Sequence, residues 1–230
     1  MIRRIPASAL LCAVAFSLTF FWQELWLVLP KAMVPGLHPI LYHNNHQWTE
    51  GAPIAELLQG TGAIATLVSG LVCLVWARKP FFFWMAFEGL FQSLSQLVIG
   101  TQLAGNDVGR ALAYLGVGET GKMVLLASAI AAMAGAGTVL ARRRPPLWEA
   151  VGAALLAILL VVPFRVPRNP IEVLLIPVIV QLCGLAFLLL GACLVRARPP
   201  AAASPLAAPA LAWLILLAVF QLVLRPGIPF

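Results

Sequence analysis

The three histidines of this 230-residue chain lie within nine consecutive positions, at His38, His43 and His46. If residues 42–50 form a helical turn, His43 and His46 share one face at i, i+3, and Glu50 joins them at i+7. Two imidazoles and one carboxylate are a ligand set that suits zinc or iron. The spacing therefore predicts a ligand, proton or metal site in this segment, with His43, His46 and Glu50 as the metal ligands.

The same segment has a second interpretation, as a loop that lies at a membrane–water interface. Tyr42 and Trp48 are typical of the aromatic belt at the headgroups. Asn44 and Asn45 favour a turn between them. In this interpretation the segment is an interfacial loop and holds no site.

A polar stripe follows one helical face of the apolar segment 80–104. Gln92 and Gln96 lie four and eight residues after Glu88, so the three side chains share that face. A carboxylate inside a membrane is costly and usually faces the bundle interior, which makes Glu88 a candidate ligand or proton group. The alternative is a structural role, in which a glutamine of another span hydrogen-bonds the stripe. Gln181, Gln59 and Gln221 are the glutamines considered for that role.

Glu24 is the acidic candidate in the first apolar segment. It lies six residues before Pro30, which places it about 9 Å below the outer end at 1.5 Å per residue. At this depth Glu24 is closer to Gln96 and the histidine segment than to Glu88. We therefore expect Glu24 to contribute to an outer pocket.

The composition requires a membrane protein to position these residues. Hydrophobic residues make up 62% of the chain and charged residues 10%, and the mean hydropathy is +0.97. A soluble domain carries about 25% charged residues. The net charge of +7 comes from scattered Lys and Arg with no basic stripe, which excludes nucleic acid as a partner. Membrane lipids are the expected surroundings.

The predicted fold is an all-α polytopic transmembrane helix bundle that forms one membrane domain over residues 1–230. A span needs about 20 mostly apolar residues. Six or seven spans fit, and we favour seven, with an outer loop at 31–57 and an inner linker at 196–205. The first span is expected to be an uncleaved helix. The seven stretches are 7–30, 57–77, 80–104, 122–141, 147–164, 171–195 and 206–225.

The distribution of basic residues predicts a cytoplasmic N-terminus. With that orientation the inner segments hold nine Lys and Arg and the outer segments six, in agreement with the positive-inside rule. The simplest location is the inner membrane of a bacterium. The nine inner residues are Arg3, Arg4, Arg78, Lys79, Arg142, Arg143, Arg144, Arg196 and Arg198.

Small residues mark the positions where helices are expected to approach closely, because they let backbones come into contact in lipid. They carry no function by themselves. These positions are Gly60, Ser69, Gly70, Ala131, Gly135, Gly184 and Gly191.

Three hypotheses for function follow. The first is a sensing, ligand-binding or regulatory membrane protein with an outer pocket near His38, His43 and His46 and a cytoplasmic protein partner at the basic inner loops. The second is a metal-dependent or acid–base membrane enzyme that acts on a lipid. The third is a transporter or a subunit of a membrane complex, which the lack of an internal repeat disfavours.

Overall fold

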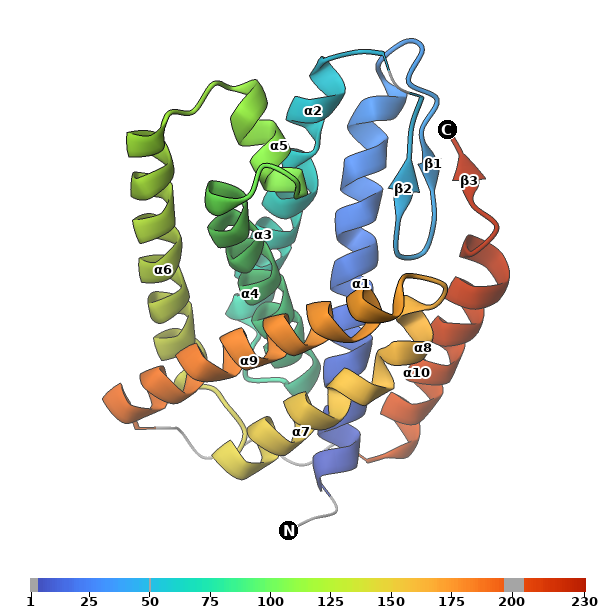
Figure 1. Ribbon diagram of the computed structural model, residues 1–230. Helices are drawn as coiled ribbons and strands as arrows, with labels where there is room; N and C mark the ends of the chain where they lie inside the picture. The colour runs from blue at the N-terminus through green and yellow to red at the C-terminus, as the bar shows by residue number, and fades with distance from the viewer. Residues whose placement is uncertain (1–3, 50, 197–204) are drawn as a thin grey trace.

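Two helices, α1 (Ile5–Ala32) and α4 (Pro80–Gln102), pack against each other in the interior of the bundle in the computed structural model (Figure 1). The structure describes residues 4–49, 51–196 and 205–230. About two thirds of the residues in the most apolar stretch of each of these helices are buried. In the peripheral helical segments Glu119–Ala141 and Ala207–Leu224 the buried share is only about a fifth. The buried helices are also the two that carry Glu24 and the polar stripe, so the fold places these polar side chains away from lipid.

Seven helical segments of the described chain are long and apolar enough to cross a membrane, which confirms the predicted all-α polytopic bundle. The protein is therefore an integral multi-pass membrane protein. The predicted inner linker at 196–205 falls almost entirely outside the described residues. The seven segments are Ile5–Ala32, Ile54–Val75, Pro80–Gln102, Glu119–Ala141, Leu147–Arg165, Pro170–Leu194 and Ala207–Leu224.

The remaining elements connect these spans. Most of them lie at the end of the bundle where α1 finishes (Figure 1). In addition to α1 and α4, the helices are α2 (Ile54–Leu58), α3 (Gly60–Val75), α5 (Asp107–Tyr114), α6 (Glu119–Ala141), α7 (Leu147–Leu160), α8 (Val162–Arg165), α9 (Pro170–Leu194) and α10 (Ala207–Val219). A π-helical turn, Phe220–Leu224, continues α10. Three short strands are β1 (Ile40–Leu41), β2 (His46–Gln47) and β3 (Ile228–Pro229).

Glycines bring the backbones of neighbouring helices into contact. A Cβ on Gly70 of α3 would lie 2.8 Å from the Leu90 nitrogen of α4, and one on Gly191 of α9 would lie 2.6 Å from Gly137 of α6. The close approaches expected at Gly70, Gly184 and Gly191 are confirmed. The expectation for Gly135 is wrong, because a Cβ there would have no neighbour within 4 Å, and the contact residue on α6 is Gly137.

The segment after α1 forms a hairpin, so the helical turn considered for residues 42–50 is wrong. Strand β1 pairs antiparallel with β2, and the amide of Tyr42 donates to the Asn45 carbonyl at 2.8 Å across the turn. Asn44 and Asn45 occupy this turn, for which their side chains are suited. On its other edge β1 pairs with β3 from the end of the chain. This long-range pairing stabilises an extended conformation that the local sequence does not require.

The pairing of β1 with β3 places residues 228–229 at the same end of the bundle as the hairpin, opposite the N-terminal end of α1 (Figure 1). This agrees with an odd number of spans. With the N-terminus cytoplasmic, a reporter fused after Phe230 is expected to be extracytoplasmic, and one inserted after Arg144 cytoplasmic. Paired alkaline phosphatase and green fluorescent protein fusions measure this. The reverse pattern would overturn the orientation, and cytoplasmic signals from both positions would contradict seven spans.

Candidate ligand-binding site

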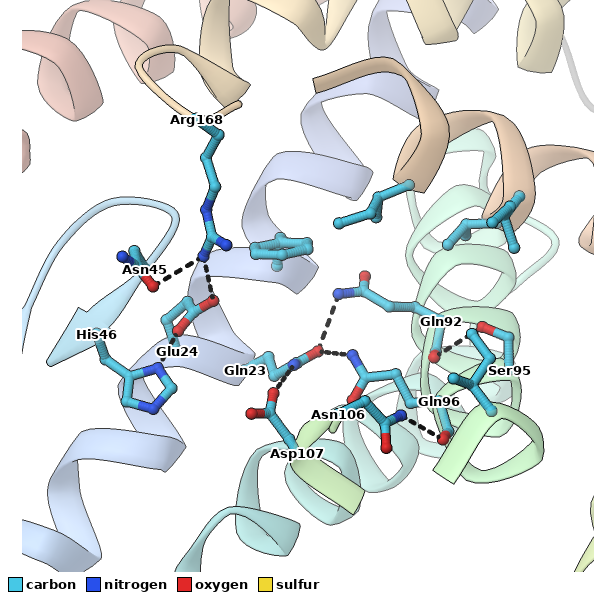
Figure 2. Close-up of a pocket in the computed structure, with 15 residues that line it drawn as sticks. Gln23, Glu24, Asn45, His46, Gln92, Ser95, Gln96, Asn106, Asp107 and Arg168 are labelled. Carbon is cyan, nitrogen blue, oxygen red and sulfur yellow. Dashed lines mark hydrogen bonds and ion pairs between the residues drawn. The ribbon is translucent and has the colours of Figure 1, made fainter. Parts of the chain in front are cut away.

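A cavity of about 280 Å³ lies beside the hairpin, between α1, α4, α5 and α9 (Figure 2). It contains four of the residues that the sequence predicts for an outer pocket: Glu24, His46, Gln92 and Gln96. Polar groups line one part of it, and apolar side chains from α1, α4 and α9 line the rest. The remaining lining residues are Phe20, Gln23, Asn45, Ser95, Ile99, Asn106, Asp107, Arg168, Ile176, Ile179 and Val180.

Three glutamines and one aspartate form a hydrogen-bond network along the wall of the cavity (Figure 2). The Gln23 Oε1 atom accepts from Gln92 Nε2 at 3.0 Å and from Gln96 Nε2 at 2.7 Å. Its Nε2 atom donates to Asp107 Oδ2 at 3.4 Å. Asn106 caps the start of α5 by accepting from the Gly109 amide at 2.7 Å, which fixes the position of Asp107. Burial and the nearby carboxylate of Glu24 raise the pKa of Asp107 above its usual range.

Glu24 is the centre of a second polar group, which contains two ion pairs. Its Oε2 atom lies 2.6 Å from His46 Nδ1, and its Oε1 atom lies 3.8 Å from the guanidinium of Arg168. The other ring nitrogen of His46 lies 3.2 Å from Gln59 Oε1. Both ring nitrogens of His46 therefore face oxygen atoms, one of a carboxylate and one of an amide.

Arg168 and Asn44 fasten the hairpin to α8 and to the segment that joins α8 to α9. The guanidinium of Arg168 donates to the Asn44 carbonyl, to Asn45 Oδ1 at 2.9 Å and to Glu172 at 3.0 Å. The Asn44 side chain donates to the carbonyls of Phe164 at 3.0 Å and Arg165 at 2.9 Å. These contacts hold Asn45 and His46 in the wall of the cavity.

The structure does not bring His43 to the site of His46. The buried His43 ring directs Nε2 to the carbonyls of Phe164 and Val166, at 3.0 and 3.2 Å, and its Nδ1 has no partner among the described residues. Burial lowers its pKa, so the neutral ring that donates from Nε2 is favoured. His38 is exposed. Glu50 lies outside the described residues, and within the described chain no three His, Cys, Asp or Glu side chains are placed to hold a metal ion.

Glu88 belongs to a separate polar cluster deeper in the bundle. Its Oε1 atom accepts from Gln181 Nε2 at 2.6 Å and from the thiol of Cys12 at 3.2 Å. Its Oε2 atom has no partner among the described residues. Of the three glutamines considered for the stripe, Gln181 bonds Glu88, as the structural interpretation expected, whereas Gln92 and Gln96 bond Gln23 of α1. Glu88 does not line the cavity, and a functional role for it stays a prediction.

Sequence reasoning missed Gln23, Asp107 and Arg168. Gln23 had a usable signal, because it is the polar neighbour of Glu24 in an apolar span. Asp107 and Arg168 lie in connections that are 61 residues apart in the chain. The predicted topology places both residues at the same end of the bundle, but it does not predict which groups their side chains contact.

No protein-family model, curated protein or solved structure matches this chain. The site is therefore interpreted from its own geometry and charge. Its main features are the cavity, the amide network that ends at Asp107, and the ion-paired carboxylate of Glu24.

Proposed function

We propose that this protein is a ligand-binding sensor or regulator of the bacterial inner membrane, and that its ligand is a small polar molecule that occupies the cavity beside the hairpin. The observation that carries the proposal is the cavity itself. Polar side chains from α1, β2, α4 and α5 converge on it, together with apolar side chains from α9. A concave site with a few convergent polar groups and an apolar wall is the usual form of a small-molecule site.

The route for a signal follows α4. Gln92 and Gln96 reach the cavity from this helix, and its other end follows the basic residues Arg78 and Lys79. The guanidinium of Arg143, in the next basic loop, hydrogen-bonds the Leu74 carbonyl near the end of α3. In our proposal these loops are the surface that a cytoplasmic protein partner recognises.

The lipid-enzyme hypothesis has one supporting observation, the pair formed by Glu24 and His46, since a carboxylate that orients an imidazole is a common acid–base device. A general base needs a ring nitrogen directed at the substrate. In this pair Nδ1 faces Glu24 and Nε2 faces Gln59. The geometry therefore favours binding over catalysis, and no feature of the described chain favours the transporter or subunit hypothesis.

A cavity-filling variant tests the proposal. Ile99→Trp places an indole in the cavity, and Ile130→Trp adds the same group to an exposed position on α6. Thermal unfolding of the purified proteins is measured with amines, amino acids, carboxylates and sugars. A ligand that binds the folded state raises Tm by mass action, with about 2.7 kcal/mol of stabilisation at 100 times Kd.

We expect at least one chemical class to raise Tm in the natural protein and in Ile130→Trp but not in Ile99→Trp. Stabilisation that is equal in Ile99→Trp would place the ligand outside the cavity. A screen without any stabilising class would contradict the proposed function.

A further inference from the structure

We propose that the ligand of this cavity is a small carboxylate, which binds at Arg168 and neutralises the buried guanidinium of Arg165 behind the cavity wall. This inference rests on the proposed function and deepens it by naming the class of ligand. It follows from the surroundings of Arg165, from the partners of the other charged groups around the cavity, and from the apolar part of the wall.

Arg165, the last residue of α8, is a buried cation without a hydrogen-bond acceptor for its side chain. The residue is 0% exposed. Its Nε, Nη1 and Nη2 atoms have no hydrogen-bond partner among the described residues. A guanidinium stays protonated in proteins, and a buried charge is costly unless it is paired and hydrogen-bonded. The described residues therefore leave a positive charge here that no direct contact neutralises.

The guanidinium of Arg165 lies against the wall of the cavity. Its central carbon is 4.2 Å from the centre of the Phe20 ring, and Phe20 lines the cavity. The face of an aromatic ring attracts a cation, but it does not replace the oxygen acceptors that five N–H groups require. Because a protein interior screens charge far less than water does, the charge of Arg165 acts across this ring on a molecule in the cavity.

The carboxylates that act on Arg165 are those of Glu24 and Glu172, and other groups contact both of them. Glu24 lies 2.6 Å from His46 and 3.8 Å from Arg168. Glu172 lies 3.0 Å from Arg168, and its side chain is 45% exposed, so water and salt screen its charge. Two carboxylates therefore serve two arginines and an imidazole, and Arg165 is the group that they do not contact.

Asp107 carries the other carboxylate of the cavity wall, and it has positive groups of its own nearby. Lys31 of α1, Arg110 of α5 and His46 of β2 all act on Asp107 and oppose the rise in its pKa that burial causes. The charge of Asp107 is therefore already shared among these groups. It does not offset the charge of Arg165.

Arg168 lines the cavity and is the group that contacts the ligand in this proposal. Its Nη1 atom donates to Glu172 and has a second N–H for a charge-assisted hydrogen bond to a carboxylate. Figure 2 shows the guanidinium of Arg168 apart from Asp107 and from the amides of Gln92 and Gln96. The oxygens of these three side chains repel a negative charge, so the carboxylate of the ligand lies at the Arg168 end.

The apolar part of the wall determines the rest of the ligand. Phe20, Ile99, Ile176, Ile179 and Val180 line this part. These side chains suit a short hydrocarbon chain, and a volume of about 280 Å³ limits the ligand to a few carbon atoms beyond the carboxylate. A polyhydroxylated molecule would leave hydroxyl groups against this wall without partners.

Three probes of matched size test the proposal on the full chain in detergent at neutral pH: butyrate, 1-butanol and butylammonium. Sodium chloride at the same ionic strength is the control for a general effect of anions. We expect butyrate to raise Tm by mass action. Butanol has the chain but no charge, and butylammonium has the opposite charge, so both should bind at least tenfold more weakly. Chloride should not raise Tm, and equal stabilisation by chloride would reduce the site to that of an adventitious ion only.

Arg165→Met separates the ligand role of this arginine from a structural one. The variant removes the buried charge and keeps an unbranched side chain against Phe20. We expect it to weaken butyrate at least tenfold without lowering Tm in the absence of ligand, because no hydrogen bond of the described side chain is lost. Arg225→Met changes an exposed arginine outside the cavity and should leave the affinity unchanged. If Arg165→Met does not fold, the probe series on the natural protein decides.

The failure of this inference can be distinguished from the failure of the proposed function. Binding of butanol or butylammonium that Ile99→Trp removes, with no preference for butyrate, would overturn the carboxylate and leave a ligand-binding cavity. An Arg165→Met protein that loses stability but binds butyrate as tightly as the natural protein would also overturn it. If no probe binds but another class from the broad screen does, the carboxylate is the wrong class.

Discussion

Replacing Glu24 with alanine is expected to lower the free energy of unfolding by about 3 kcal/mol, the lower end of the range for breaking a buried ion pair. The Glu24 and His46 side chains are only 4% and 8% exposed, and their atoms lie 2.6 Å apart. Removing the carboxylate leaves the imidazole and the Arg168 guanidinium at the cavity without their shared partner. The unfolding midpoint in detergent measures the loss.

An exposed ion pair of the same protein serves as the control for Glu24. Glu119 pairs with Lys122 at 2.9 Å, but its side chain is 86% exposed. Exposed pairs contribute about 0–1 kcal/mol, so Glu119→Ala should change the midpoint little. Equal losses in the two variants would show that the pair formed by Glu24 and His46 is not what holds the hairpin end together.

Replacing Gly89 with valine is the second change from which we expect a large loss, about 3 kcal/mol, since overpacking of a close contact forces the backbones apart. A Cβ at this position would lie 2.8 Å from the Gly70 Cα and 3.1 Å from the Thr66 carbonyl oxygen. Both of these atoms belong to the backbone of α3, so a change of rotamer cannot relieve the clash. Helices α3 and α4 would have to separate along their contact.

Gly135→Val is the matched control for Gly89→Val. Both glycines are inside a membrane-spanning helix, but a Cβ on Gly135 would meet nothing within 4 Å. The two variants therefore share the change in helix propensity and differ only in the clash. Thermal unfolding and the monodispersity of the detergent-purified proteins measure both effects. A Gly89→Val protein as stable as Gly135→Val would contradict the close packing of α3 on α4.

Hydropathy predicted the seven spans because a bilayer requires long apolar helices almost regardless of the fold around them. The spacing of Gln92 and Gln96 likewise predicted a shared face, and the depth of Glu24 predicted its place near the histidine segment. Each of these predictions uses only the geometry of one helix. Together they identified part of the polar wall of the cavity.

The other part of the site depends on contacts between distant segments. The pairing of Ile40 with Pro229 decides that residues 40–47 form a hairpin rather than a helical turn. Asp107 and Arg168 reach the cavity only because their loops meet at one end of the bundle. The wrong expectation for Gly135 on α6 has a similar cause. This helix is apolar on every side, so its sequence does not distinguish the face with Gly135 from the face with Gly137, which contacts α9.

The hairpin is made of strands with two residues each, and a segment of that size alone would open and close rapidly in water. Here β3 occupies one edge of it, and Arg168 and Asn44 tie its turn to α8 and to the segment after α8. Opening requires these contacts to break together. The hydrogen-bonded amide hydrogens of residues 40–47 should therefore exchange with solvent deuterium slowly and as a group, and the wall formed by Asn45 and His46 should persist as long as this whole end of the bundle.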